Sequence, residues 1–137
     1  MGGLGSLAVI LLDTHVLVWA VADSKKLSRG TELAIRKSRQ EDGVAISAIT
    51  LWELALLVAR GRIQDYGTVE SFVERLTEGV TLKPITPNIA ALATQFPDDY
   101  PRDPADRLIA ATARAEGLAL ITRDESIRRS PLLKTIW

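Results

Sequence analysis

Short, continuous apolar runs alternate along the chain with longer stretches in which apolar residues recur at helical spacing. The continuous runs lie at 7–12, 44–48 and 118–122. Such runs are typical of strands that are buried on both faces of a parallel sheet. Residues 80–85 predict a further strand, and Pro84 indicates that this strand lies at a sheet edge or ends there. Residues 133–137 are a candidate for one more short strand.

The stretches between these runs carry the start and end signals of helices. Residues 16–22 continue the first strand into a helix, and Ser28 precedes a helix over about 31–40. Further start signals are Thr50, Thr68, Thr86-Pro87 and Asp103-Pro104. The matching end signals are Gly61, Gly79 and Gly117.

Strands that alternate with helices predict an α/β protein, here a three-layer α/β/α sandwich with a mostly parallel central sheet. The 137 residues suit a single domain, which we place at 7–137 after a flexible, Gly-rich leader at 1–6. Ligands of such sheets bind at the carboxyl ends of the strands, so the residues that follow each strand are the first candidates for chemistry.

Composition excludes several classes of site. The chain has no Cys, which rules out disulfides and thiol chemistry, and it contains neither a P-loop nor a G-x-S-x-G motif. Its 17 basic and 17 acidic side chains give zero formal net charge, so any nucleic acid would have to bind a local basic patch. The most apolar stretch, 8–22, contains Asp13 and His15 and is too short to span a membrane. We therefore expect a cytoplasmic protein.

Four carboxylates occupy equivalent places in the strand–helix alternation: Asp13, Glu53, Asp106 and Asp124. In a parallel sheet these places meet at one edge, where the carboxylates repel one another unless a cation lies between them. Mg²⁺ and Mn²⁺ prefer oxygen ligands of this kind and can activate a water molecule for phosphodiester hydrolysis. The pattern indicates a catalytic metal site.

Each of these acids also has an interpretation as a helix cap. The first and the fourth would cap the segments that follow them. Glu53 stands three residues after Thr50, which is the spacing of a capping box. Asp106 stands three residues after Asp103, whose main role we predict to be capping. A non-catalytic α/β module, with or without bound Mg²⁺, is therefore an open alternative.

A phosphatase with Asp13 as its nucleophile is a second alternative. Such enzymes usually carry another Asp two residues later, where this chain has His15. This lone histidine is either a structural residue or a contact of the metal ligands or the substrate.

Four sequence blocks resemble the PIN domain of VapC-type toxins, from about Leu7 to Trp137. The blocks are LLDTHVLVW, SAITLWEL, RDPADRLIAATA and LITRD. The resemblance implies an α/β/α sandwich, a Mg²⁺- or Mn²⁺-dependent ribonuclease and a cognate antitoxin. It assigns both catalysis and metal binding to Asp13, Glu53, Asp106 and Asp124. Thr122 matches a small hydroxyl residue near the fourth acid, and Thr14 would orient the first.

An RNA substrate requires basic side chains at the rim of the pocket, because phosphate contacts supply most of the non-specific affinity. The nearest candidates are Arg102, Arg107 and Arg123, and Thr14 and Thr122 are further candidates for substrate contact. More distant candidates are Arg36, Lys37, Arg39, Arg60 and Arg62. The alternative is that most of these lie on solvated helix faces and that Arg107 pairs with a neighbouring acid.

The segment around Trp52 is more apolar than a single core contact requires. Its apolar neighbours are Leu51, Leu54, Leu56 and Leu57. Such a helix predicts a homodimer contact or a groove for an antitoxin segment, unless it is simply central in the fold. A typical antitoxin of the family would block the pocket with a basic side chain.

Overall fold

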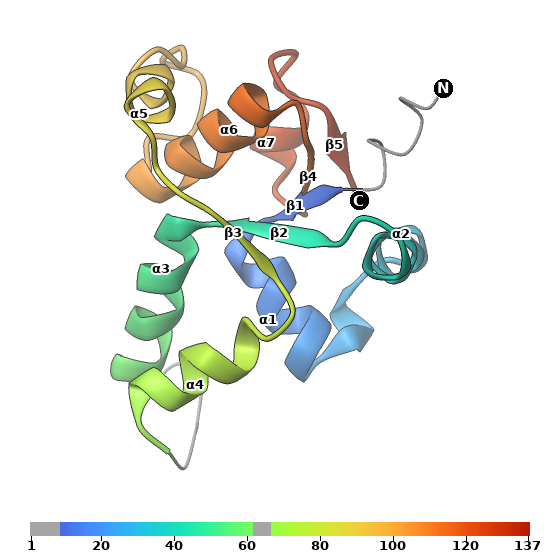
Figure 1. Ribbon diagram of the computed structural model, residues 1–137. Coiled ribbons are helices and arrows are strands. Elements are labelled where there is room, and N and C mark those ends of the chain that lie inside the picture. The colour runs from blue at the N-terminus through green and yellow to red at the C-terminus, as the bar shows by residue number, and fades with distance from the viewer. Residues whose placement is uncertain (1–8, 62–66) are drawn as a thin grey trace.

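The computed structural model describes residues 9–61 and 67–137. The five strands among these residues form one sheet in the order β3-β2-β1-β4-β5, and each neighbouring pair is parallel (Figure 1). The strands are β1 (Ile10–Leu12), β2 (Val44–Ser47), β3 (Thr81–Lys83), β4 (Ala119–Ile121) and β5 (Thr135–Ile136). The helices are α1 (Thr14–Ala22), the short η2 (Ser24–Lys26), α2 (Arg29–Gln40), α3 (Ala48–Ala59), α4 (Val69–Leu76), α5 (Pro87–Ala93), α6 (Pro104–Glu116) and α7 (Glu125–Arg128).

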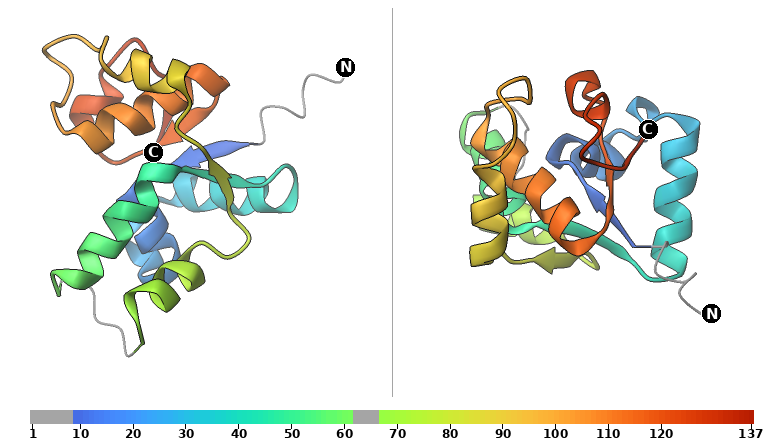
Figure 2. Two further views of the ribbon diagram at one scale, coloured as in Figure 1. Left: turned by 60° about the vertical axis from the view of Figure 1, so that its left-hand side comes forward. Right: turned by 90° about the horizontal axis from the view of Figure 1, so that it is seen from above.

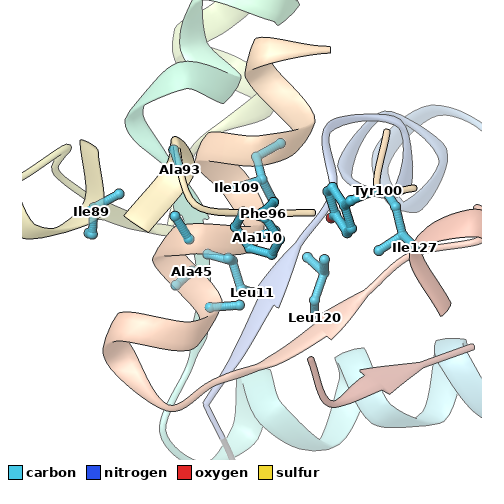
Figure 3. Packing of buried hydrophobic residues seen from close by; sticks show 12 residues of the cluster. Leu11, Ala45, Ile89, Ala93, Phe96, Tyr100, Ile109, Ala110, Leu120 and Ile127 are labelled. Atoms are coloured by element: carbon cyan, nitrogen blue, oxygen red, sulfur yellow. The ribbon is translucent and has the colours of Figure 1, made fainter. Parts of the chain in front are cut away.

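Helices cover both faces of the sheet, as Figures 1 and 2 show. On one face, α5, α6 and α7 pack over Leu11, Ala45 and Leu120 (Figure 3). On the other face, α1, α2, α3 and α4 pack over a second core that includes Ile10 and Leu12. Successive residues of β1 thus enter opposite cores, which is the period of two expected of a strand.

The predicted three-layer α/β/α fold is confirmed, and the sheet is parallel throughout its described strands. Strand β3 lies at the sheet edge, as Pro84 indicates, and β5 is the short strand expected within 133–137. The leader predicted at 1–6 and the first two residues of the strand predicted at 7–12 lie outside the described residues. Among the helices that the structure describes, none has the length and apolar character needed to span a membrane.

Three helices begin earlier than the sequence predicts. Helix α2 begins at Arg29, directly after the predicted cap Ser28, and not at about residue 31. Helix α1 begins at Thr14 because the carboxylate of Asp13 caps it. Helix α3 is capped by Ser47, whose hydroxyl accepts a hydrogen bond from the backbone N–H two residues on at 3.3 Å. Thr50 therefore lies inside α3, and the predicted capping box between Thr50 and Glu53 is wrong.

Strand β1 is the point at which the strand order reverses, because β2 lies on one side of it and β4 on the other. In open α/β sheets such a switch point leaves a crevice at the carboxyl ends of the strands. Leu12 and Ile121 are paired in register at these ends, and the Asp13 N–H donates to the Ile121 carbonyl at 3.0 Å. Asp13 and Thr122, which follow these two residues, therefore lie next to each other at the end of the sheet.

Candidate active site

A cavity of about 530 Å³ lies at the carboxyl ends of β1 and β4. Five carboxylates line it: Asp13, Glu53, Asp103, Asp106 and Asp124. The other lining residues are His15, Val16, Trp19 and Arg123. The structure thus brings the four acids of the predicted site around one cavity, with the capping acid of α6 as a fifth.

Asp13 is oriented from two neighbouring strand ends. Its Oδ1 accepts a hydrogen bond from the Thr14 N–H at 2.8 Å, and its Oδ2 accepts one from the Thr122 hydroxyl at 2.9 Å. The first of these bonds caps α1, so the capping interpretation is correct for this residue. The same carboxylate lines the cavity, so capping and a functional role are compatible.

Two buried hydroxyls hold Glu53, which reaches the cavity from α3. The Thr14 hydroxyl donates to Glu53 Oε1, and Thr50 Oγ1 lies 3.0 Å from Thr14 Oγ1. Because the single proton of the Thr14 hydroxyl is engaged by Glu53, Thr50 is the donor in the second bond. Thr14 is therefore a support for two acids, Asp13 through its backbone and Glu53 through its hydroxyl.

Thr14 and Thr122, which the sequence suggested as substrate contacts, have relative exposures of only 1% and 0%. Both hydroxyls point to carboxylates. They lie beneath the acids and not at the surface, so we correct the prediction that RNA touches them directly.

Asp103 and Asp106 stand three residues apart but have different surroundings. Asp103 Oδ1 accepts from the backbone N–H groups of Ala105 at 2.8 Å and of Asp106 at 3.4 Å, which confirms its predicted role as the cap of α6. The carboxylate of Asp106 has no hydrogen-bond partner in the described part of the chain. It is not the second member of a capping box, so capping does not account for it.

Asp124 caps the four-residue helix α7, as the sequence alternative proposed. Its Oδ1 accepts from the N–H groups of Ser126 at 2.8 Å and Ile127 at 3.2 Å. Its own N–H donates to Thr122 Oγ1 at 3.2 Å. Thr122 therefore connects this acid to Asp13, to which it donates its proton.

Burial and mutual repulsion raise the pKa of three of these carboxyl groups. For Asp13 and Glu53 burial is the main cause, and hydrogen bonds from Thr122 and Thr14 oppose it in part. The pKa of Asp106 rises to about 7, first because of burial and then because of the charge of Asp13 and of the other acids. The ionised forms of these carboxyl groups are therefore destabilised in the cavity, and a bound positive charge would stabilise them.

The donor set fits a hard divalent cation, because all five acids offer carboxylate oxygens. Within 9–61 and 67–137, none of these acids forms an ion pair with a Lys or Arg side chain. Over the same ranges, no three Asp, Glu or His side chains are already grouped to bind one ion. Mg²⁺ usually keeps several water ligands and needs only one or two carboxylates directly, so the cavity suits a hydrated ion.

Comparison with known proteins identifies the family. Residues 10–131 match the family model of the PIN domain. The chain belongs to the PIN-domain family. It is 41% identical over 133 residues to Ribonuclease VapC22 of Mycobacterium tuberculosis, an alignment that covers 96% of this chain and 100% of that protein. Within the PIN domains, it therefore belongs with the VapC ribonucleases.

Solved structures share the PIN fold. VapBC2 from Rickettsia felis, bound to a DNA fragment from its promoter, gives a TM-score of 0.73 at 19% identity and covers 93% of this chain and 97% of that chain. A toxin-antitoxin complex from Klebsiella pneumoniae gives a TM-score of 0.65 at 22% identity, with 93% and 96% covered. At these identities the likeness establishes the fold alone.

The three arginines predicted near the pocket of this PIN domain lie in different places. Arg123 lines the cavity, with its guanidinium 5.8 Å from the centre of the Trp19 ring. Arg102 is exposed but is not part of the cavity lining. The guanidinium of Arg107 donates hydrogen bonds to backbone carbonyls of the loop at 96–101. Among the described residues it forms no salt bridge, so the alternative of an ion pair with a neighbouring acid is wrong. Its contact with RNA stays a prediction.

Two residues of the site were not predicted to belong to it: Trp19, and Thr50, which the sequence indicated only as a helix cap. Trp19 lines the cavity one helical turn after His15, and their ring centres are 6.0 Å apart. Thr50 supports Glu53 from one turn earlier in α3. In both cases the spacing along a helix from a candidate residue was the available signal. Arg62, one of the distant basic candidates, lies outside the described residues.

Proposed function

We propose that this VapC-family protein is an endoribonuclease that hydrolyses RNA with a divalent cation, Mg²⁺ or Mn²⁺, at the carboxylate cavity. Asp13, Glu53 and Asp106 would hold the ion, and Asp124 would contribute directly or through water. The observation that carries the proposal is the gathering of these four carboxylates around one cavity. Burial and mutual repulsion raise the pKa of three of them, Asp13, Glu53 and Asp106. A divalent cation would offset the repulsion among these carboxylates, and a cation held in this way supports the hydrolysis of phosphodiesters.

The residues of the chain have separate tasks in this mechanism. When bound, the cation polarises a phosphate oxygen and lowers the pKa of an attacking water molecule. Thr122 and Thr14 fix the carboxylates of Asp13 and Glu53 before the substrate arrives, so little reorganisation is needed during the reaction. The buried position of these two hydroxyls keeps water from competing for the same carboxylate oxygens.

A positively charged rim beside the cavity would hold the RNA phosphates. Arg123 lies over one side of Trp19, and the Lys26 ammonium lies 5.9 Å from the centre of the same ring. Both side chains are exposed, and each cation contacts the ring of Trp19, which lines the cavity. Lys26 also forms an ion pair with Asp23 at 4.0 Å. Arg102 would be a further contact for the RNA chain outside the cavity.

We also propose a cognate antitoxin and a homodimer as partners. Support for the antitoxin comes from the solved toxin-antitoxin complex with the same fold. On α3, Trp52 is 60% exposed, whereas Leu54 is buried in the core, so only part of the apolar helix is available for a partner. A basic side chain of the antitoxin would enter the acidic cavity and compete with the cation. An RNA substrate would place this activity in the cytoplasm.

The experiment compares the cleavage of a labelled RNA by the parent, Asp13→Asn and Asp98→Asn, with Mg²⁺, with Mn²⁺ and with EDTA. Asp98 is an exposed loop acid outside the cavity and serves as the control. We expect the parent and Asp98→Asn to cleave the RNA with either metal ion and to stop in EDTA. Asp13→Asn should not cleave the RNA, although circular dichroism should show that it is folded. Equal cleavage by Asp13→Asn would refute the proposal. A covalent phosphoaspartate trapped from a small phosphate ester would support the phosphatase alternative.

A further inference from the structure

The hydroxyl of Tyr100 is buried without a hydrogen-bond partner. The residue is 3% exposed, and its hydroxyl oxygen is the buried side-chain polar atom that has no partner among the described residues. Its ring lies 4.6 Å from the ring of Phe96, and Figure 3 shows it beside Ile127 and above Leu120. A phenylalanine would supply the same packing, and a buried hydroxyl without a partner costs the free energy of its lost hydration.

Three acids of the cavity lie near enough to this hydroxyl for their charges to act on it. Burial raises the pKa of Tyr100, and the charges of Asp106, Asp13 and Asp124, in that order, raise it further. The phenol therefore keeps its proton and is a hydrogen-bond donor. Among the carboxylates, Asp106 acts on it most strongly.

Asp106 is the complementary group. The other four acids of the cavity each accept at least one hydrogen bond: Asp13, Glu53, Asp103 and Asp124. The carboxylate of Asp106 accepts none in the described part of the chain. A buried donor without an acceptor thus lies near a half-buried acceptor without a donor.

The Arg107 side chain ties the loop of Tyr100 to the helix that carries Asp106. Arg107, the residue after Asp106, donates to the carbonyl of Tyr100 at 3.3 Å, and its guanidinium lies 6.0 Å from the centre of the Tyr100 ring. The same guanidinium also binds the carbonyls of Phe96 and Pro101. The loop that carries Tyr100 is therefore tied to the first turn of α6, which carries Asp106.

We propose that Tyr100 is a positioning residue for the metal site: its hydroxyl donates to one carboxylate oxygen of Asp106 when a divalent cation is bound. The bond orients Asp106 so that its other oxygen faces the cation. This proposal rests on the proposed function, because it needs a cation in the cavity. In the absence of the cation the hydroxyl contributes nothing to stability, and that is its testable signature.

The test uses Tyr100→Phe, which removes only the hydroxyl, and Ile127→Val as a control that trims the same core without touching a polar group. In EDTA, we expect the urea midpoint of Tyr100→Phe to equal or exceed that of the parent, and the midpoint of Ile127→Val to fall. Mn²⁺ affinity, measured by calorimetry, should weaken by about 10-fold in Tyr100→Phe only, as for other residues that orient metal ligands. Saturating Mn²⁺ should restore its rate of RNA cleavage.

Two results would overturn the proposal while leaving the proposed function intact: a parent-like Mn²⁺ affinity for Tyr100→Phe, or a lower urea midpoint for this variant in EDTA. The second would mean that the hydroxyl already has a stabilising partner in the metal-free protein. If the parent itself binds no Mn²⁺ and cuts RNA equally well in EDTA, both the proposed function and the role of Tyr100 are wrong.

Discussion

The two sides of the acidic cavity differ in how completely the protein itself satisfies their carboxylates. On the side of β1 and β4, Asp13 accepts a hydrogen bond at each oxygen, and Asp124 accepts two at one oxygen. On the side of α6, Asp106 accepts none in the described part of the chain, and its pKa rises to about 7. The hydrogen bonds of the fold hold the acids of the first side in place, and they also hold Asp103, the cap of α6. Asp106 is instead stabilised only by what binds in the cavity.

The largest effect should distinguish the two acids of α6. Asp106→Asn should lower the rate of RNA cleavage by at least about 100-fold, because a carboxylate that would hold the cation is lost. Asp103→Asn is the matched control, because Asp103 caps α6 and Asn also caps helices well. We expect it to keep the rate within a few-fold of the parent. Equal losses in initial rate for the two variants would contradict the comparison.

The support beneath Glu53 should give the next largest effect. Thr14→Val keeps the shape of the side chain but removes the donor to Glu53 and the acceptor of Thr50. We expect a loss of about 1–3 kcal/mol in the free energy of unfolding and a loss of about 10-fold in activity. Thr112→Val removes a buried hydroxyl that bonds only a carbonyl of its own helix, so its activity should not change. Urea titrations and initial rates check both variants.

A smaller effect is expected at the rim of the cavity. Arg123→Ala should weaken RNA binding a few-fold and reduce the slope of log affinity against log salt by about 1, because one phosphate contact is lost. Arg36→Ala, on the surface of α2 in a pair with Glu32, should change neither quantity. Fluorescence anisotropy of a labelled RNA at several salt concentrations measures the slope. An unchanged slope for Arg123→Ala would remove this residue from the RNA site.

The smallest effect is a slope of stability with pH in EDTA. The pKa of Asp106 is 3.8 in the unfolded reference and about 7 in the folded protein, so between these values the folded protein binds more protons. Its free energy of unfolding must then fall as pH rises towards and through 7. Urea unfolding between pH 5.5 and 8 should show this fall in the parent and a shallower one in Asp106→Asn. A steeper fall in the variant would contradict the assignment.

Much of this could be predicted from local sequence signals. Continuous apolar runs gave β1, β2 and β4, and the Asp-Pro and Thr-Pro pairs gave the starts of α6 and α5, because such signals act within a few residues. The start of α3 was mistaken because Ser47 and Thr50 are both good caps, and only the end of β2 decides between them.

The environment of each site residue could not be predicted in the same way. Glu53 and Thr14 are far apart in sequence, and no local pattern shows that one donates to the other. Likewise, the loop carbonyls that occupy Arg107 depend on how residues 96–101 fold over α6. Charge and spacing indicated which acids gather, whereas hydrogen bonding between distant segments decides which of them is held in place.

The most direct test of the account is a crystal structure of the parent soaked with Mn²⁺, with the ion located by its anomalous scattering. We expect a Mn²⁺ ion in the cavity, bound by Asp106 and at least one of Asp13 and Glu53, with water completing its coordination. Tyr100 should then donate to Asp106. A cavity without Mn²⁺ at a concentration that supports RNA cleavage, or Mn²⁺ bound only elsewhere on the protein, would contradict the central claim that these carboxylates form one metal site.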